Sequence, residues 1–155
     1  MKLSDSSPKQ VKPKQATNAM TQSKVTSMNI SVTANGKAYR FTLLDNPTAK
    51  DFYARLPLKL TLKDYANTEK IAMLEQKLTK AQAPKGTSAK RGDITYYAPW
   101  GNLALFYRDF GYADGLIPLG TLSNETSKEM SKAVSEEFVE LLSGKDLEVV
   151  FDKQP

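Results

Sequence analysis

The first alternating pattern of hydrophobic and polar positions begins near Met28 and runs, with one interruption, to Leu43. Residues 30–34 and 39–43 each place a hydrophobic residue at every second position, which is typical of half-buried strands. Asn35-Gly36 stands between these two segments. Both central residues of a type I′ turn need positive φ, which Asn and Gly supply, so the pattern predicts a β-hairpin.

The period then changes to that of a short helix. Asn46 can cap it, Pro47 suits its first turn, and Pro57 stops it. Four hydrophobic residues would share one helix face: Ala49, Phe52, Tyr53 and Leu56.

Alternation returns at residues 58–62 and predicts a further strand. Residues 63–83 are ambiguous between helix and strand, and we favour a short strand at Lys70–Leu74. Turns are expected at residues 84–86 and 91–93. Four more strands are predicted, at Ile94–Tyr97, Leu103–Tyr107, Leu116–Leu122 and 147–151.

A second helix is predicted after residue 125. Thr126 and Glu129 have the spacing of a capping box, and Gly144 follows the last hydrophobic position. The expected hydrophobic stripe is Met130, Ala133, Val134, Phe138, Leu141 and Leu142. Many short strands with two helices indicate a mainly β domain, either a closed barrel or a sandwich.

The charge is uneven along the chain and divides it into two parts. Residues 1–27 carry five lysines and one aspartate with few large hydrophobic residues, which predicts a disordered basic tail or linker. Residues 28–155 hold 17 basic and 16 acidic residues and form the expected folded domain. The nearly neutral domain gives no indication of nucleic-acid binding.

The chain has no cysteine and no histidine. Disulfides, thiolate nucleophiles and Ser-His-Asp or Cys-His catalysis are thereby excluded. No hydrophobic segment approaches the ~20 residues that span a bilayer. We expect no cofactor and no metal site, and either a cytoplasmic location or export followed by removal of a leader.

Three segments carry a resemblance to a known family: DNPTAKDF (Asp45–Phe52), LPLKLTLKDYANTEKI (Leu56–Ile71) and GDITYYAPWGNLALFYRDFGYADGLIPLG (Gly92–Gly120). In these the chain resembles the bacterial cyclophilin-like fold family, a group of small barrels distantly related to cyclophilins. The resemblance implies a closed β-barrel of about eight strands with two helices capping the ends. Cyclophilins carry a catalytic arginine in a Phe-His-Arg stretch and a nearby Phe-Met-x-Gln segment, and neither stretch occurs here.

Seven of the fourteen aromatic residues lie between Tyr96 and Tyr112, which makes this segment the candidate ligand site. Neighbours in a strand face opposite sides, so one of Tyr96 and Tyr97, and one of Phe106 and Tyr107, should leave the core. The alternative is that all of them pack the barrel. The predicted ligand-binding residues are Glu69, Tyr97, Trp100, Asn102, Tyr107, Arg108 and Phe110.

Each polar candidate has a second interpretation. Glu69 would bind a cationic or hydroxyl group, or else form a surface salt bridge with Lys70 or another neighbour. Asn102 would hydrogen-bond a ligand, or else serve as a turn residue with left-handed φ. Arg108 would hold a carbonyl or carboxylate, or else pair with Asp109.

The expected function is a non-enzymatic binding module for a small molecule or short peptide. A divergent peptidyl-prolyl cis-trans isomerase is the first alternative, with Arg108 as the hydrogen-bond donor. An accessory protein-interaction domain is the second. We expect a monomer without nucleic-acid partners and without a membrane span. A tether to an envelope is one role open to its tail.

Overall fold

The computed structural model describes residues 28–123 and 128–154, and the side chains of all of these except 128–131. The predicted basic tail at 1–27 and the capping box of Thr126 and Glu129 lie outside the described residues, as does the side chain of Met130. Within the described part, no helix is long and hydrophobic enough to cross a membrane.

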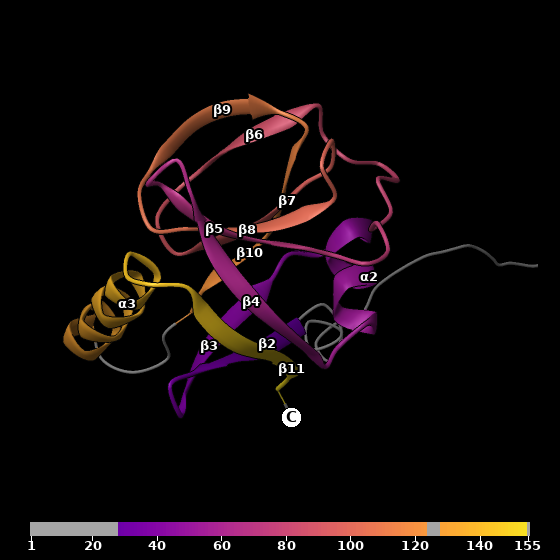
Figure 1. The fold of residues 1–155 in the computed structure, drawn as a ribbon. Helices are drawn as coiled ribbons and strands as arrows, with labels where there is room; N and C mark the ends of the chain where they lie inside the picture. Colours follow the sequence, from indigo (N-terminus) through magenta and orange to yellow (C-terminus); the bar gives the residue numbers. More distant parts are fainter. Residues whose placement is uncertain (1–27, 124–127, 155) are drawn as a thin grey trace, which may run out of the picture.

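Eight antiparallel strands close into a barrel in the order β10-β3-β2-β11-β4-β5-β8-β7 (Figure 1). The mainly β fold and the closed eight-stranded barrel are therefore confirmed. The strands are β2 (Met28–Ala34), β3 (Lys37–Leu43), β4 (Leu58–Tyr65), β5 (Glu69–Met73), β7 (Asp93–Tyr97), β8 (Asn102–Phe106), β10 (Leu116–Leu122) and β11 (Leu147–Lys153).

The predicted hairpin forms as expected, since Asn35 and Gly36 adopt φ of 51° and 76° between β2 and β3. The helix α2 (Pro47–Ala54) is also confirmed, with the Asn46 side chain accepting a hydrogen bond of 2.7 Å from the Ala49 amide. The favoured strand in the ambiguous segment forms as β5, one residue earlier than predicted at each end.

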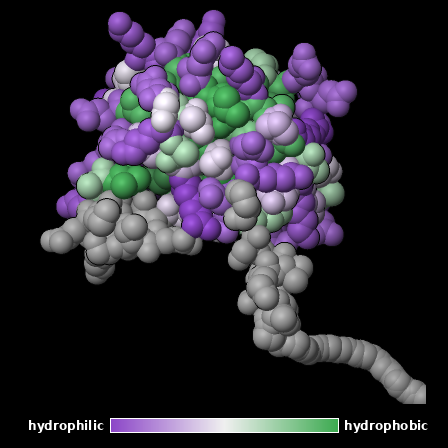
Figure 2. Space-filling view, turned by 90° about the horizontal axis from the view of Figure 1, so that it is seen from below, coloured by the Kyte–Doolittle hydropathy of each residue, from purple (hydrophilic) through white to green (hydrophobic). Residues whose placement is uncertain are grey.

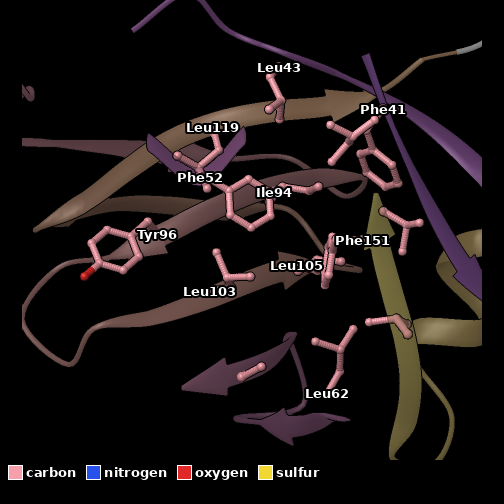
Figure 3. Packing of buried hydrophobic residues seen from close by; sticks show 14 of the residues in the cluster. Phe41, Leu43, Phe52, Leu62, Ile94, Tyr96, Leu103, Leu105, Leu119 and Phe151 are labelled. Atoms are coloured by element: carbon pink, nitrogen blue, oxygen red, sulfur yellow. The ribbon is translucent and has the colours of Figure 1, made fainter. Parts of the chain in front are cut away.

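The barrel interior is filled by alternate side chains of every strand. Figure 3 shows Ile94 and Tyr96 of β7, and Leu103 and Leu105 of β8, directed into this interior. Phe52 of α2 packs there against Phe151 of β11, with ring centroids 5.6 Å apart. Seen from below, the described surface carries hydrophilic residues around its rim and hydrophobic residues toward its middle (Figure 2).

The helix α3 (Lys128–Leu142) packs on the barrel through Phe138 and Leu142, which are fully buried. Phe138 lies against Phe41, at a centroid distance of 5.2 Å. The predicted stripe is wrong at Ala133, which is exposed. The buried face of α3 is centred on Phe138 and Leu142, and Ala133 lies on the other side of the helix.

Two further strands, β6 (Gly86–Ala89) and β9 (Phe110–Asp114), pair with each other and stay outside the barrel. The sequence analysis predicted neither strand, and the turn predicted at 84–86 runs into β6 at Gly86. In Figure 1 this two-stranded ribbon arches over the side of the barrel formed by β5, β8 and β7.

Candidate functional site

A pocket of about 210 Å³ lies between the β6–β9 ribbon and the outer face of the barrel. The lining residues come from β4, β5, β7, β8, β9, the start of β10 and the turn between β7 and β8. They are Tyr65, Glu69, Ile71, Tyr97, Trp100, Asn102, Phe106, Phe110, Ala113 and Leu116.

Strand alternation explains why these side chains reach the pocket. On β7, Tyr96 is 1% exposed and belongs to the barrel core, so its neighbour Tyr97 faces outward. On β8, Leu103 and Leu105 fill the interior, whereas Asn102 and Phe106 face the pocket. The predicted division of Tyr96 and Tyr97 between the two faces is thus confirmed.

The floor of the pocket is a small second hydrophobic cluster between the ribbon and the barrel. Its buried members are Ala89, Ala104, Phe106 and Leu116. Burial of these side chains from both sides is what holds the short ribbon on the barrel, because an isolated two-stranded sheet is marginally stable in water.

The mouth of the pocket is aromatic. The Trp100 ring lies 5.3 Å from the Tyr65 ring and 5.4 Å from the Tyr97 ring, with interplanar angles of 86° and 82°. Phe110 lies 5.5 Å from Phe106. Trp100 is 47% exposed, as predicted for a residue at a hairpin tip, and Tyr65 is 42% exposed. Exposed aromatic side chains gathered at a concave site are typical of a binding surface.

Gly115 fixes the position of the turn that carries Trp100. Its φ is +86°, and a Cβ there would lie 2.7 Å from Cδ of Pro99. The Ala98 amide donates a 3.0 Å hydrogen bond to the Gly115 carbonyl, so the turn is tied to the β9–β10 junction.

Glu69 is the one carboxylate among the lining residues, and Lys and Arg are absent from them. Its carboxyl makes no hydrogen bond or salt bridge with any residue that the structure describes. Burial, and to a smaller extent the negative charge of Asp64, together raise the pKa of this carboxyl from 4.5 to about 7. A half-buried acid without a partner is a candidate for ligand contact.

Asn102 supplies a second polar group to the pocket wall. Its side chain is 1% exposed, and Nδ2 donates a 3.0 Å hydrogen bond to the Leu103 carbonyl. A carbonyl only accepts, so this contact fixes the amide orientation and makes Oδ1 the remaining acceptor. Among the described residues, Oδ1 of Asn102 has no hydrogen-bond partner. The alternative of a turn residue is wrong, because Asn102 begins β8 and Gly101 takes the positive φ.

Five of the seven predicted site residues meet in this pocket, and Tyr107 and Arg108 lie outside it. Tyr107 is buried, and its hydroxyl donates a hydrogen bond to the carboxylate of Asp64 on β4, the strand that pairs with β5. Burial and that hydrogen bond raise the pKa of Tyr107 to about 12. Arg108 is exposed beyond the end of β8.

The two alternative ion pairs of the sequence analysis do not form. Lys70 is 1% exposed and turns away from Glu69, with Nζ 3.3 Å from Asp64 Oδ1 and 2.8 Å from the Gly144 carbonyl. Asp109 accepts a 3.0 Å hydrogen bond from the Arg91 amide and is not paired with Arg108. The first correction follows from strand alternation, since Glu69 and Lys70 must face opposite sides of β5.

Five lining residues were not predicted: Tyr65, Ile71, Phe106, Ala113 and Leu116. Ile71 shares the outward face of β5 with Glu69, so alternation alone could have identified it once β5 was placed. Tyr65 comes from β4 and reaches the pocket only because β4 pairs with β5 and β5 with β8.

Comparisons with known proteins agree with this architecture. A model of the cyclophilin-like family matches residues 32–142. The fold is similar to the solution structure of a hypothetical protein from Archaeoglobus fulgidus, with a TM-score of 0.51 and 15% identity. That similarity covers 83% of this chain and 96% of the other. No curated protein matches the chain. The bacterial qualification in the expected family name is not part of these findings.

Proposed function

The chain belongs to the cyclophilin-like family, and from this premise we propose that its domain is a non-enzymatic module that binds a small molecule or short peptide. The observation that carries the proposal is the outer-face pocket, whose aromatic mouth and hydrophobic floor surround two unpaired acceptors. Ligand sites commonly combine a mainly apolar lining with a few convergent polar groups that orient the ligand.

The alternatives receive less support from the same pocket. An isomerase of cyclophilin type would place a guanidinium donor against the substrate carbonyl, and among the residues that the structure describes no arginine lines the pocket. A purely protein-interacting domain would need no hollow of this volume. A concave site with an unpaired buried acceptor is better matched by a ligand that enters it.

The proposal is tested by ¹H–¹⁵N NMR titration of the folded domain with a panel of small aromatic fragments and capped short peptides. We expect amide shift changes that cluster at residues 69–71, 97–106 and 110–116, and saturate with one ligand. Shift changes scattered over the barrel, or none with any probe, would contradict a binding function for this pocket.

Two exposed aromatic residues provide a matched pair of variants. Trp100→Ala removes part of the pocket mouth, and we expect it to weaken binding at least tenfold with little effect on folding. Tyr112→Ala removes a side chain that is 60% exposed and does not line the pocket, so binding should be unchanged. Equal effects of the two substitutions would remove the support that Trp100 gives to the proposal.

A further inference from the structure

The formal charge of the described pocket lining is negative only. Glu69 and Asn102 Oδ1 are both hydrogen-bond acceptors, and none of the ten lining residues carries a positive charge. An acceptor of this kind is satisfied by an N–H or O–H donor, and a carboxylate by a cation. The charge of the pocket therefore favours cations over carboxylate or phosphate ligands.

The surroundings of Glu69 add a second feature that favours a cation. In the barrel register, Glu69 lies opposite Tyr65 of β4 and opposite Phe106 of β8. Directly paired residues on antiparallel strands lie about 5 Å apart, so the carboxylate stands between two aromatic side chains. The negative faces of aromatic rings attract cations within about 6 Å of the ring centre.

The rings of the pocket mouth extend this arrangement. Trp100 contacts Tyr65 at nearly a right angle, and Phe110 contacts Phe106. Each of the two aromatic neighbours of Glu69 is thus in contact with a second ring that also lines the pocket. Several aromatic rings gathered around one site are the arrangement by which proteins recognise organic ammonium groups, and here a carboxylate lies among them.

We propose, building on the binding function proposed above, that the ligand is an organic ammonium ion. Its charged nitrogen binds at the Glu69 carboxylate between Tyr65 and Phe106, and its hydrocarbon part packs on Trp100 and Phe110. Asn102 Oδ1 accepts a hydrogen bond from a donor farther along the ligand. Asn102 pairs with Met73, four residues along β5 from Glu69, so the two acceptors lie at opposite ends of the pocket.

The volume of the pocket limits the size of the group that enters it. An apolar cavity of about 150 Å³ is large enough to hold benzene. The pocket of about 210 Å³ therefore has room for an aromatic or branched alkyl group with a short aminoalkyl arm.

The test compares two probes of nearly equal shape that differ in charge, phenethylammonium and 2-phenylethanol. Trp100 is the only tryptophan of the chain and lies at the pocket mouth, so its fluorescence at pH 8 follows both titrations. We expect the wild-type domain to bind the ammonium on the order of tenfold more tightly than the alcohol. We expect Glu69→Gln to abolish this preference, and Glu148→Gln, at an exposed acid of β11, to leave it unchanged.

The outcomes separate this inference from the proposed function. Equal binding of both probes would overturn the cation preference while leaving the binding function intact. Preference for the ammonium that survives in Glu69→Gln would overturn the assigned site. No binding of either probe, together with fragment binding in the NMR titration, would likewise refute the inference alone.

A further titration identifies the source of the ammonium. It uses an acetylated and amidated tripeptide with a central lysine. Tighter binding of this peptide than of phenethylammonium assigns the ammonium group to a peptide side chain. Tighter binding of phenethylammonium assigns it to a free amine.

Discussion

Substitution of Glu69 by glutamine should stabilise the domain at alkaline pH. The carboxyl has a pKa of about 7 in the folded chain and an ordinary value of 4.5 when exposed. A group with a raised folded-state pKa favours folding while it is protonated. Its contribution is present below pH 4.5 and is lost as the pH rises through about 7. Glutamine keeps the shape of the protonated acid and cannot ionise, so the variant escapes that loss.

The structure sets the size of this effect. A rise of the pKa from 4.5 to about 7 corresponds to roughly 3 kcal/mol of differential stability. Glu69 is only half-buried, and solvent screening reduces the figure. We expect Glu69→Gln to raise the free energy of unfolding by roughly 1 kcal/mol at pH 8 and to change it little at pH 4.5.

Urea denaturation followed by circular dichroism at both pH values measures this difference. The matched control is Glu148→Gln, which removes an exposed acid of β11 and should have no pH-dependent effect. A Glu69→Gln variant that is equally or less stable than the wild type at pH 8 would refute the reasoning. It would mean that the ionised carboxylate is satisfied in the folded chain.

Three further results are expected. Tyr96→Phe removes the hydroxyl that accepts a 3.0 Å hydrogen bond from the buried Leu78 amide. It should reduce the free energy of unfolding in urea by about 1–3 kcal/mol, and a loss below 0.5 kcal/mol would contradict the importance of that bond. Phe138→Ala deletes the fully buried ring that packs α3 on the barrel. Calorimetry should show a loss of about 3–5 kcal/mol, against almost none if α3 is loosely attached. In a protease-coupled assay on proline tetrapeptides, the wild type and Arg108→Ala should both show the uncatalysed rate. Catalysis lost in the variant would instead favour the isomerase.

Elements with local signals were predictable from the sequence. The first hairpin depends on Asn35-Gly36, and α2 depends on Asn46 and Pro47, all of which act within a few residues of their own position. The predicted strands likewise fall within three residues of the observed ends of the barrel strands. Physical causes that operate over short distances leave clear patterns in the chain.

The β6–β9 ribbon had no such signal. All but one of the β9 residues are exposed, and β6 is short and formed of small residues, so neither strand shows hydrophobic alternation. Their pairing joins Gly86 to Asp114 across a long separation. The ribbon forms because its few buried side chains meet the outer barrel face, and that face exists only once the barrel has closed.

The site was predictable to the extent that it lies in one segment. Tyr97, Trp100, Asn102 and Phe110 belong to the aromatic segment itself, and strand alternation indicated that one of Tyr96 and Tyr97 leaves the core. Tyr65 could not be found in this way, because the pairing of β4 with β5 brings it to the pocket. That Lys70 and Glu69 face opposite sides could have been predicted once the bounds of β5 were known. The ambiguous pattern of residues 63–83 did not define those bounds.

The two faces of the barrel wall have separate consequences for sequence change. Inward residues of β5, β7 and β8 pack the barrel core, whereas several of their outward neighbours set the shape and charge of the pocket. A substitution at an outward position that is not buried can therefore alter the shape or charge of the pocket while the barrel core stays intact. The barrel is in this respect a durable scaffold, on which new specificities could be selected, or designed, one position at a time.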